Sequence, residues 1–121
     1  MASVKLKLKR IYEPAEDTDG QRFLVERLWP RGISKDRARL AAWLKDAAPS
    51  TELRKWYDHS PAKWDTFRRR YFSELERHPE AVVPLRQAAR KSTVTLVFAS
   101  KPPELSCAQA LKEYLENGPA R

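Results

Sequence analysis

Residues 93–99 read TVTLVFA, and this stretch decides the fold class. The run is rich in β-branched residues and almost wholly apolar, which is typical of a strand covered on both faces. Strands of that kind belong to sheets whose neighbouring strands are connected by helices. The stretch therefore predicts an α/β domain in which residues 93–99 lie inside a small sheet.

Two further strands are predicted near the N-terminus. Over residues 4–8, apolar residues alternate with lysines, which gives a strand one apolar and one polar face. Lysines on the polar face would protect an edge strand from pairing with other chains. The second strand is RFLVERL at residues 22–28, and the proline and glycine of residues 29–32 end it.

Helical patterns fill the rest of the chain. Ser34 suits the N-cap of a helix ending at Pro49, with an apolar stripe at Leu40, Trp43, Leu44 and Ala47. Further helices are expected over residues 50–57, 60–78, 80–91 and 106–117, with a late start or a kink at Pro84. We therefore predict a single compact α/β domain over residues 1–121, with about three strands, at least partly parallel, covered by about five helices.

The amino-acid composition limits the classes of function that the protein can have. The chain has 121 residues, 24 Lys and Arg against 16 Asp and Glu, and a formal net charge of +8, which favours anionic partners. One cysteine and two histidines are too few for the usual structural zinc site, so we expect neither a metal nor a cofactor. No apolar stretch is long enough to span a membrane, and we expect a cytoplasmic protein.

Two loops carry the candidate binding residues. Arg27, Trp29 and Arg31 follow the second predicted strand, and Lys101 and Ser106 follow the third. If these strands are parallel neighbours, both loops lie at the carboxyl edge of the sheet, where ligands of α/β proteins bind. The arginines would clamp an anionic small molecule such as a nucleotide or phosphometabolite. Lys101 would add positive charge, and Ser106 and the helix start would add hydrogen bonds. The side chain of Trp29 would form one wall of the site.

Structural roles are the alternative for these residues. Arg27 would then pair with Glu26 or another carboxylate, and Trp29 would belong to the core. Cys107 stands at a helix start, where a thiol pKa can fall, but no histidine is near in sequence to act as its base. A small apolar role is therefore favoured for Cys107.

The remaining polar residues give no complete catalytic set. Turn or capping roles are favoured for His59 and His78, and nothing in the spacing of Asp46 and Asp58 requires an acid–base pair.

Two other functions stay open. The basic residues of segments 5–10 and 68–70 would suit a nucleic-acid-binding module, although the aromatic residues beside Arg68 follow helical spacing. A solvated helix face is the simpler interpretation of segment 68–70. A metal-free hydrolase or transferase is the third hypothesis, without a nucleophile–base pair to support it.

Three sequence strings resemble a known family. VERLWPRGISK at residues 25–35, WLKD at 43–46 and APSTELRKW at 48–56 closely resemble the YeaO-like bacterial proteins, a family of unknown function. The resemblance extends over residues 4–115 and implies a compact, cytoplasmic, single-domain α/β protein, without an established reaction. Relatives usually have Asp at the position of Glu26. They also usually carry a Lys-Asp-x-x-His-Asn loop where this chain reads KPPELSC at 101–107, so any chemistry of that loop would be lost or altered here.

Overall fold

The computed structural model describes residues 6–100 and 103–117. Within these ranges the chain forms one sheet of four parallel strands and five α-helices, so the predicted α/β class is confirmed. The strands are β1 (Leu6–Arg10), β2 (Gln21–Leu24), β3 (Ala42–Trp43) and β4 (Val94–Phe98), in the spatial order β1-β4-β2-β3. The helices are α1 (Lys35–Ala38), α2 (Thr51–Tyr57), α3 (Trp64–Arg77), α4 (Val83–Lys91) and α5 (Cys107–Asn117).

β4 lies in the centre of the sheet, as its apolar sequence predicts. Leu96 pairs with Leu8 of β1 on one side and with Phe23 of β2 on the other. All five residues of β4 are buried, because both faces of the sheet are covered. The strand predicted over residues 93–99 is therefore confirmed.

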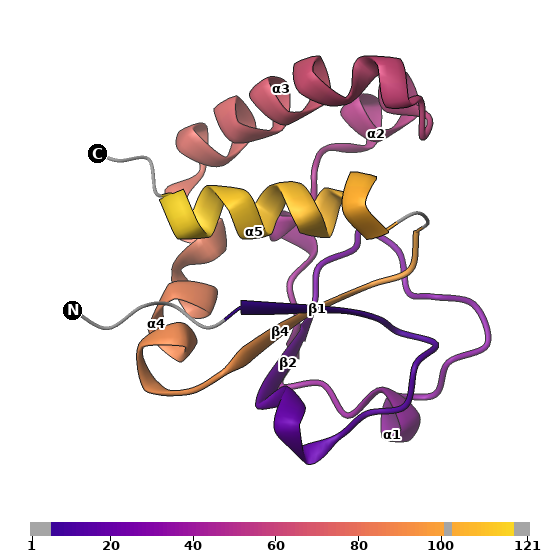
Figure 1. Cartoon of the computed structure of the whole chain (residues 1–121), viewed down its shortest axis with the longest axis vertical. Coiled ribbons are helices and arrows are strands. Elements are labelled where there is room, and N and C mark those ends of the chain that lie inside the picture. Colours follow the sequence, from indigo (N-terminus) through magenta and orange to yellow (C-terminus); the bar gives the residue numbers. More distant parts are fainter. Residues whose placement is uncertain (1–5, 101–102, 118–121) are drawn as a thin grey trace.

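The main core lies on one face of the sheet. There α5 packs on β1 and β4, α4 packs on β4, and α3 packs on α5 and α2 (Figure 1). The buried residues Phe67, Tyr71 and Leu75 recur every four positions of α3 and give that helix a single apolar face. The long helix predicted after Pro61 is thus confirmed over Trp64–Arg77, with a short 3-10 turn before it.

The opposite face is covered by loops and by the single turn of α1 (Figure 1). A small apolar cluster lies there, made of Ile11, Leu24, Ile33, Ala38 and Val97. Because successive strand residues point to opposite faces, the residues beside this cluster in β1 and β2 include the charged Lys9 and Arg22.

Asp19 neutralises these two buried cations. Its fully buried carboxylate accepts hydrogen bonds from Lys9 Nζ at 3.1 Å and from Arg22 Nη1 at 2.7 Å. Burial raises the pKa of Asp19, but hydrogen bonds from Lys9, the Glu16 backbone and Arg22 outweigh it and bring the pKa to about 2. Lys9 is 9% exposed, so this lysine of the edge strand β1 lies in the interior and not on the solvent face.

The helix predicted between Ser34 and Pro49 is wrong. Ser34 caps α1, but the helix ends after one turn, where Arg39 adopts a left-handed conformation with φ of 49°. Residues 42–43 instead form β3 and pair with β2, and Leu44 N–H donates to Leu24 O at 2.8 Å. If residues 42–44 were helical, the backbone groups on one edge of β2 would lack strand partners. The hydrogen bonds between β2 and β3 therefore outweigh the helical periodicity of the local sequence.

Helix α2 begins after a serine cap, whereas Ser60 makes no side-chain capping hydrogen bond and α3 begins at Trp64. Ser50 caps α2 by accepting a hydrogen bond from Leu53 N–H at 3.1 Å. Pro84 lies in the first turn of α4, where its missing N–H has no helical partner to lose, so the late start is confirmed. None of the helices in the described ranges is long and apolar enough to cross a membrane.

Candidate functional site

A pocket of about 350 Å³ lies where the chain leaves β2 and β4. Parallel strands end at the same edge of the sheet, so the segments after both strands meet there, together with α2 and the start of α5. Its lining combines basic, acidic, hydroxyl and aromatic side chains: Glu26, Leu28, Thr51, Arg54, Lys55, Tyr57, Asp58, His59, Phe67, Ser100, Leu105, Ser106 and Cys107.

Glu26 fixes the floor of this pocket. The residue is 6% exposed, and its Oε2 accepts a hydrogen bond from the Ala99 N–H at 2.9 Å. Its backbone carbonyl accepts another from Trp43 Nε1 at 2.7 Å. Glu26 therefore ties the ends of β2 and β4 together while its carboxylate lines the pocket.

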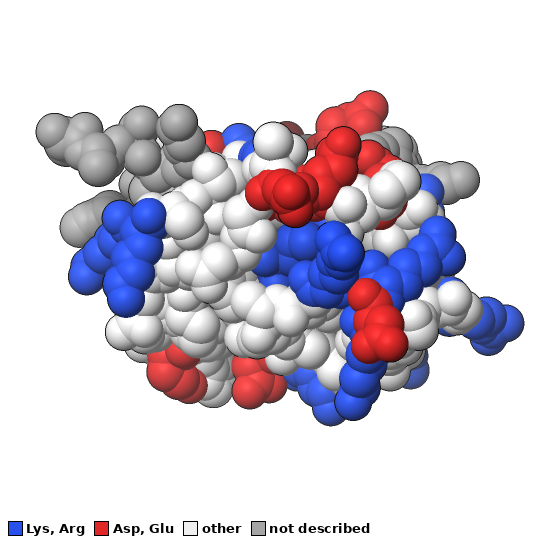
Figure 2. Space-filling view, turned by 90° about the horizontal axis from the view of Figure 1, so that it is seen from below, with Lys and Arg blue, Asp and Glu red and all other residues white. Residues whose placement is uncertain are grey.

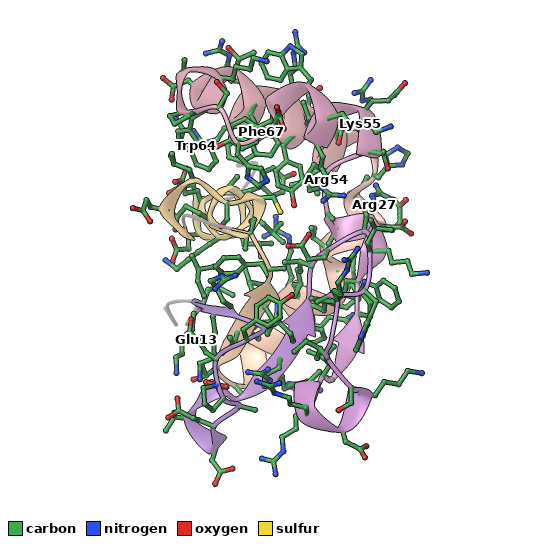
Figure 3. The ribbon with its side chains drawn as sticks, turned by 90° about the vertical axis from the view of Figure 1, so that its right-hand side faces the viewer. Glu13, Arg27, Arg54, Lys55, Trp64 and Phe67 are labelled. Carbon is green, nitrogen blue, oxygen red and sulfur yellow. The ribbon has the colours of Figure 1, made fainter. Side chains whose placement is uncertain are left out.

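Helix α2 brings two cations to the pocket. Arg54 and Lys55 extend from this helix, on the same side of the sheet as Phe67 of α3 (Figure 3). Arg54 is half-buried, and its guanidinium makes no hydrogen bond or ion pair with any residue in the described ranges. An uncommitted guanidinium in a pocket wall is available to an anionic ligand.

Two residues in left-handed conformations follow α2 and also line the pocket. Asp58 has φ of 45° and His59 has φ of 55°. Conformations of this kind cost non-glycine residues about 1–3 kcal/mol each and are common at binding and catalytic sites. Both residues line the same pocket as Arg54.

The start of α5 also lines the pocket, through Ser106 and Cys107. Ser106 is 3% exposed, and its hydroxyl caps α5 by accepting a hydrogen bond from Gln109 N–H at 3.1 Å. The Gln109 side chain donates to Glu113 at 3.0 Å, one turn further along the helix.

Cys107 is the first residue of α5. Burial, with a smaller contribution from the charge of Glu26, raises the pKa of its thiol to about 12. The thiol is therefore protonated at neutral pH, and the start of the helix does not activate it as a nucleophile.

Aromatic side chains make the apolar wall. The rings of Tyr57 and Phe67 stack with centroids 4.3 Å apart, and the Tyr57 hydroxyl donates to Leu105 O at 2.8 Å. Leu28, 72% exposed, adds an apolar side chain to the lining.

Arg27 points away from this pocket. Its Nε donates to Pro49 O at 3.1 Å and its Nη2 to Ala48 O at 3.3 Å, and Nη1 lies 3.5 Å from the exposed carboxylate of Asp46. It lines a separate hollow of about 500 Å³ with Trp43. The guanidinium therefore holds the segment before α2 against the end of β2.

Two other predicted site residues, Trp29 and Arg31, lie outside the lining of the pocket. Trp29 Nε1 donates to Ile33 O at 2.6 Å, and its ring packs edge-on against Trp43. Arg31 is exposed and does not line the pocket, and Lys101 lies outside the described residues. Of the four predicted residues that the structure describes, Ser106 lines the pocket and Arg27, Trp29 and Arg31 do not.

Ion pairs use part of the basic surface that suggested nucleic-acid binding. Arg68 pairs with Glu113 at 2.7 Å and with Asp65 at 2.9 Å, and Lys9 is held by Asp19. On the face seen from below, basic side chains lie between acidic ones (Figure 2). Among the residues that the structure describes, no three His, Cys, Asp or Glu side chains are grouped to hold a metal ion.

Sequence reasoning missed Arg54 and Lys55, because it considered the loops after the strands and treated α2 as a packing helix. Their signal is the family string APSTELRKW at residues 48–56, which contains both cations.

Comparisons with known proteins agree with the resemblance in these strings. The model of the family described as "Inactive DUF488-N3 subclade" matches residues 5–121. The uncharacterized protein Rv3073c of Mycobacterium tuberculosis (strain H37Rv) is 43% identical over 111 residues, which cover 92% of this chain and 93% of the relative. The uncharacterized protein YeaO of Escherichia coli (strain K12) is 40% identical over 114 residues, 94% of this chain and 99% of the relative. No solved structure matches the chain significantly. The chain therefore belongs to the YeaO-like proteins of the inactive DUF488-N3 subclade.

Proposed function

We propose that this protein binds a small anionic molecule, such as a nucleotide or a phosphometabolite, in the pocket between α2 and the start of α5. The observation that carries the proposal is that Arg54, a half-buried residue of the pocket wall, makes no side-chain hydrogen bond or ion pair within residues 6–100 and 103–117. Lys55 adds a second positive charge to the lining.

The surroundings of Arg54 support an anionic ligand. The first turn of α5 leaves backbone N–H groups without helical partners, and its dipole favours negative charge. Thr51 and Ser100 add hydroxyl groups to the lining, and Tyr57 and Phe67 add an apolar surface for the body of the ligand. The volume of about 350 Å³ lies in the range of small-molecule sites.

The residues of the pocket favour ligand binding over catalysis. The matching family is described as inactive. The Cys107 thiol, with its pKa raised to about 12, is protonated at neutral pH and is therefore a poor nucleophile. We therefore propose a ligand-binding protein and not a hydrolase or transferase.

The clamp in this proposal differs from the one expected from sequence. The guanidinium of Arg27 donates to two backbone carbonyls and pairs with Asp46. The guanidinium of Arg54 has no such partners in the described ranges. Arg31 and Trp29 lie outside the pocket lining. The anion would therefore meet Arg54 and Lys55 first, with Ser106 contributing the cap of the helix that faces it.

Isothermal titration calorimetry with AMP and with inorganic phosphate tests the proposal. Arg54→Ala should weaken AMP binding more than tenfold, since a charge-assisted hydrogen bond contributes about 1.5–3 kcal/mol. Arg31→Ala removes the same charge outside the pocket and is the matched control, expected to leave the affinity unchanged. Loss of binding in Arg31→Ala but not in Arg54→Ala would support the clamp predicted from sequence and refute the pocket. Absence of binding by both probes would refute the proposal altogether.

A further inference from the structure

Glu26 places a buried negative charge in the wall of the pocket that we propose to bind an anion. The residue is 6% exposed, so most of its surface is removed from bulk water. A buried charge is costly unless hydrogen bonds or an opposite charge compensate it. A ligand in this pocket therefore meets the carboxylate of Glu26 as well as the guanidinium of Arg54.

The hydrogen bonds of Glu26 leave one oxygen for a ligand. Oε2 accepts from the Ala99 N–H at 2.9 Å, and no donor in the described ranges is bonded to Oε1. A carboxylate oxygen can only accept, so the group that completes its hydrogen bonding must bring a proton. An ammonium, amine, amide N–H or hydroxyl group meets this requirement, whereas a deprotonated phosphate or carboxylate oxygen does not.

The charges of the pocket are balanced. Arg54 and Lys55 are matched in number by Glu26 and Asp58 within the described lining. Glu26 and Arg54 also act in opposite directions on the same Cys107 thiol, one raising and the other lowering its pKa, so both charges lie close to that atom. A ligand with negative charge alone would be attracted by one wall and repelled by the other.

We infer that the molecule bound here carries an ammonium group in addition to its anionic group, and that Glu26 binds this ammonium. This inference rests on the proposed function and narrows its ligands to the zwitterionic class. In the bound state the anionic group lies toward Arg54 and the start of α5, and the donor lies toward Glu26 Oε1. Glu26 is then a specificity-determining residue as well as a link between β2 and β4.

A pair of matched probes tests the inference. Phosphoethanolamine and n-propyl phosphate have the same chain length and differ in the terminal group, an ammonium in one and a methyl in the other. The wild-type protein should bind phosphoethanolamine at least about tenfold more tightly, because the charge-assisted hydrogen bond to Glu26 is absent from the propyl complex. Equal affinities for the two probes in the wild-type protein would overturn the inference.

The variant Glu26→Gln tests the assignment to this residue. Its amide oxygen can still accept from the Ala99 N–H, but its charge is gone. The preference for phosphoethanolamine should disappear, while n-propyl phosphate binds as well as before or better. Glu76→Gln, an exposed carboxylate of α3 outside the pocket lining, should retain the preference. Thermal unfolding of each variant checks that the fold is kept, and the wild-type comparison of probes needs no variant.

The outcomes separate this inference from the proposed function. If AMP binds through Arg54 but the two small probes bind equally, the inference is wrong and the anion site remains. A preference that survives Glu26→Gln also overturns the role of Glu26. If neither AMP nor the small probes bind, the proposed function fails, and the inference fails with it.

Discussion

Removing the charge of Asp19 is expected to destabilise the protein strongly at neutral pH. Asp19→Asn preserves the size of the side chain and leaves Lys9 and Arg22 without their shared counter-ion. Lys9 retains Glu16 at 2.8 Å, and Arg22 retains the Ala38 carbonyl at 2.9 Å. Breaking a buried ion pair costs about 3–5 kcal/mol, and these remaining partners place the expected loss near 3 kcal/mol.

The pH dependence gives a second measure of the same interaction. The pKa of Asp19 falls from 3.8 to about 2 in the folded protein, so folding stabilises the ionised carboxylate. A lowered pKa contributes stability that is present above the unfolded value and is lost as the pH falls from about 4 to 2. The shift corresponds to about 2 kcal/mol, since one pKa unit equals about 1.36 kcal/mol.

Urea unfolding at several pH values tests this reasoning. At pH 7 the wild-type protein should be about 3 kcal/mol more stable than Asp19→Asn, and the difference should shrink by about 2 kcal/mol as the pH approaches 2. A difference below about 0.5 kcal/mol at pH 7 would show that the network contributes little. A difference that does not change with pH would contradict the assignment of its source to the carboxylate charge.

Three more predictions concern local features. Gly20→Ala should lower the free energy of unfolding, measured in urea, by at least about 1–3 kcal/mol. Gly20 has φ of 66°, and an added Cβ would lie 2.2 Å from Thr93 O. An unchanged urea midpoint would refute the close approach. Ser50→Ala should lower stability by about 1–2 kcal/mol, because the hydroxyl caps α2 and donates to Glu74 at 2.6 Å; Thr in its place should recover part of the loss. The Cys107 thiol, with its pKa near 12, should react with iodoacetamide far more slowly at pH 7.5 than a free thiol does, and the labelling rate of the folded protein should rise at high pH. Rapid labelling at neutral pH would show an accessible thiolate.

Periodicity predicts those elements whose packing is visible in their own sequence. The apolar run of β4 and the four-residue recurrence of Phe67, Tyr71 and Leu75 belong to elements buried on a regular pattern. β3 has two residues, and its partner β2 lies far back along the chain, so no local pattern distinguishes it from a helix. The left-handed Arg39 that ends α1 has no signal in its residue type.

The place of the candidate site was easier to predict than its side chains. The rule that ligands bind at the carboxyl ends of parallel strands leads to the pocket, and the cap of α5 brings Ser106 to it. The direction of Arg27 depends on the carbonyls of Ala48 and Pro49, which only the folded chain brings beside β2. Arg54 reaches the pocket because α2 packs on α3, a contact that sequence spacing does not reveal.

The most direct test of the central claim is a titration of the ¹⁵N-labelled protein with AMP, followed by the backbone amide shifts. Binding at the proposed pocket should shift the amides of residues 51–59 and 106–108 together, with a common dissociation constant. Arg54→Ala should abolish these shifts at the same AMP concentration. Shifts confined to residues 27–31, or none at saturating AMP, would contradict the account.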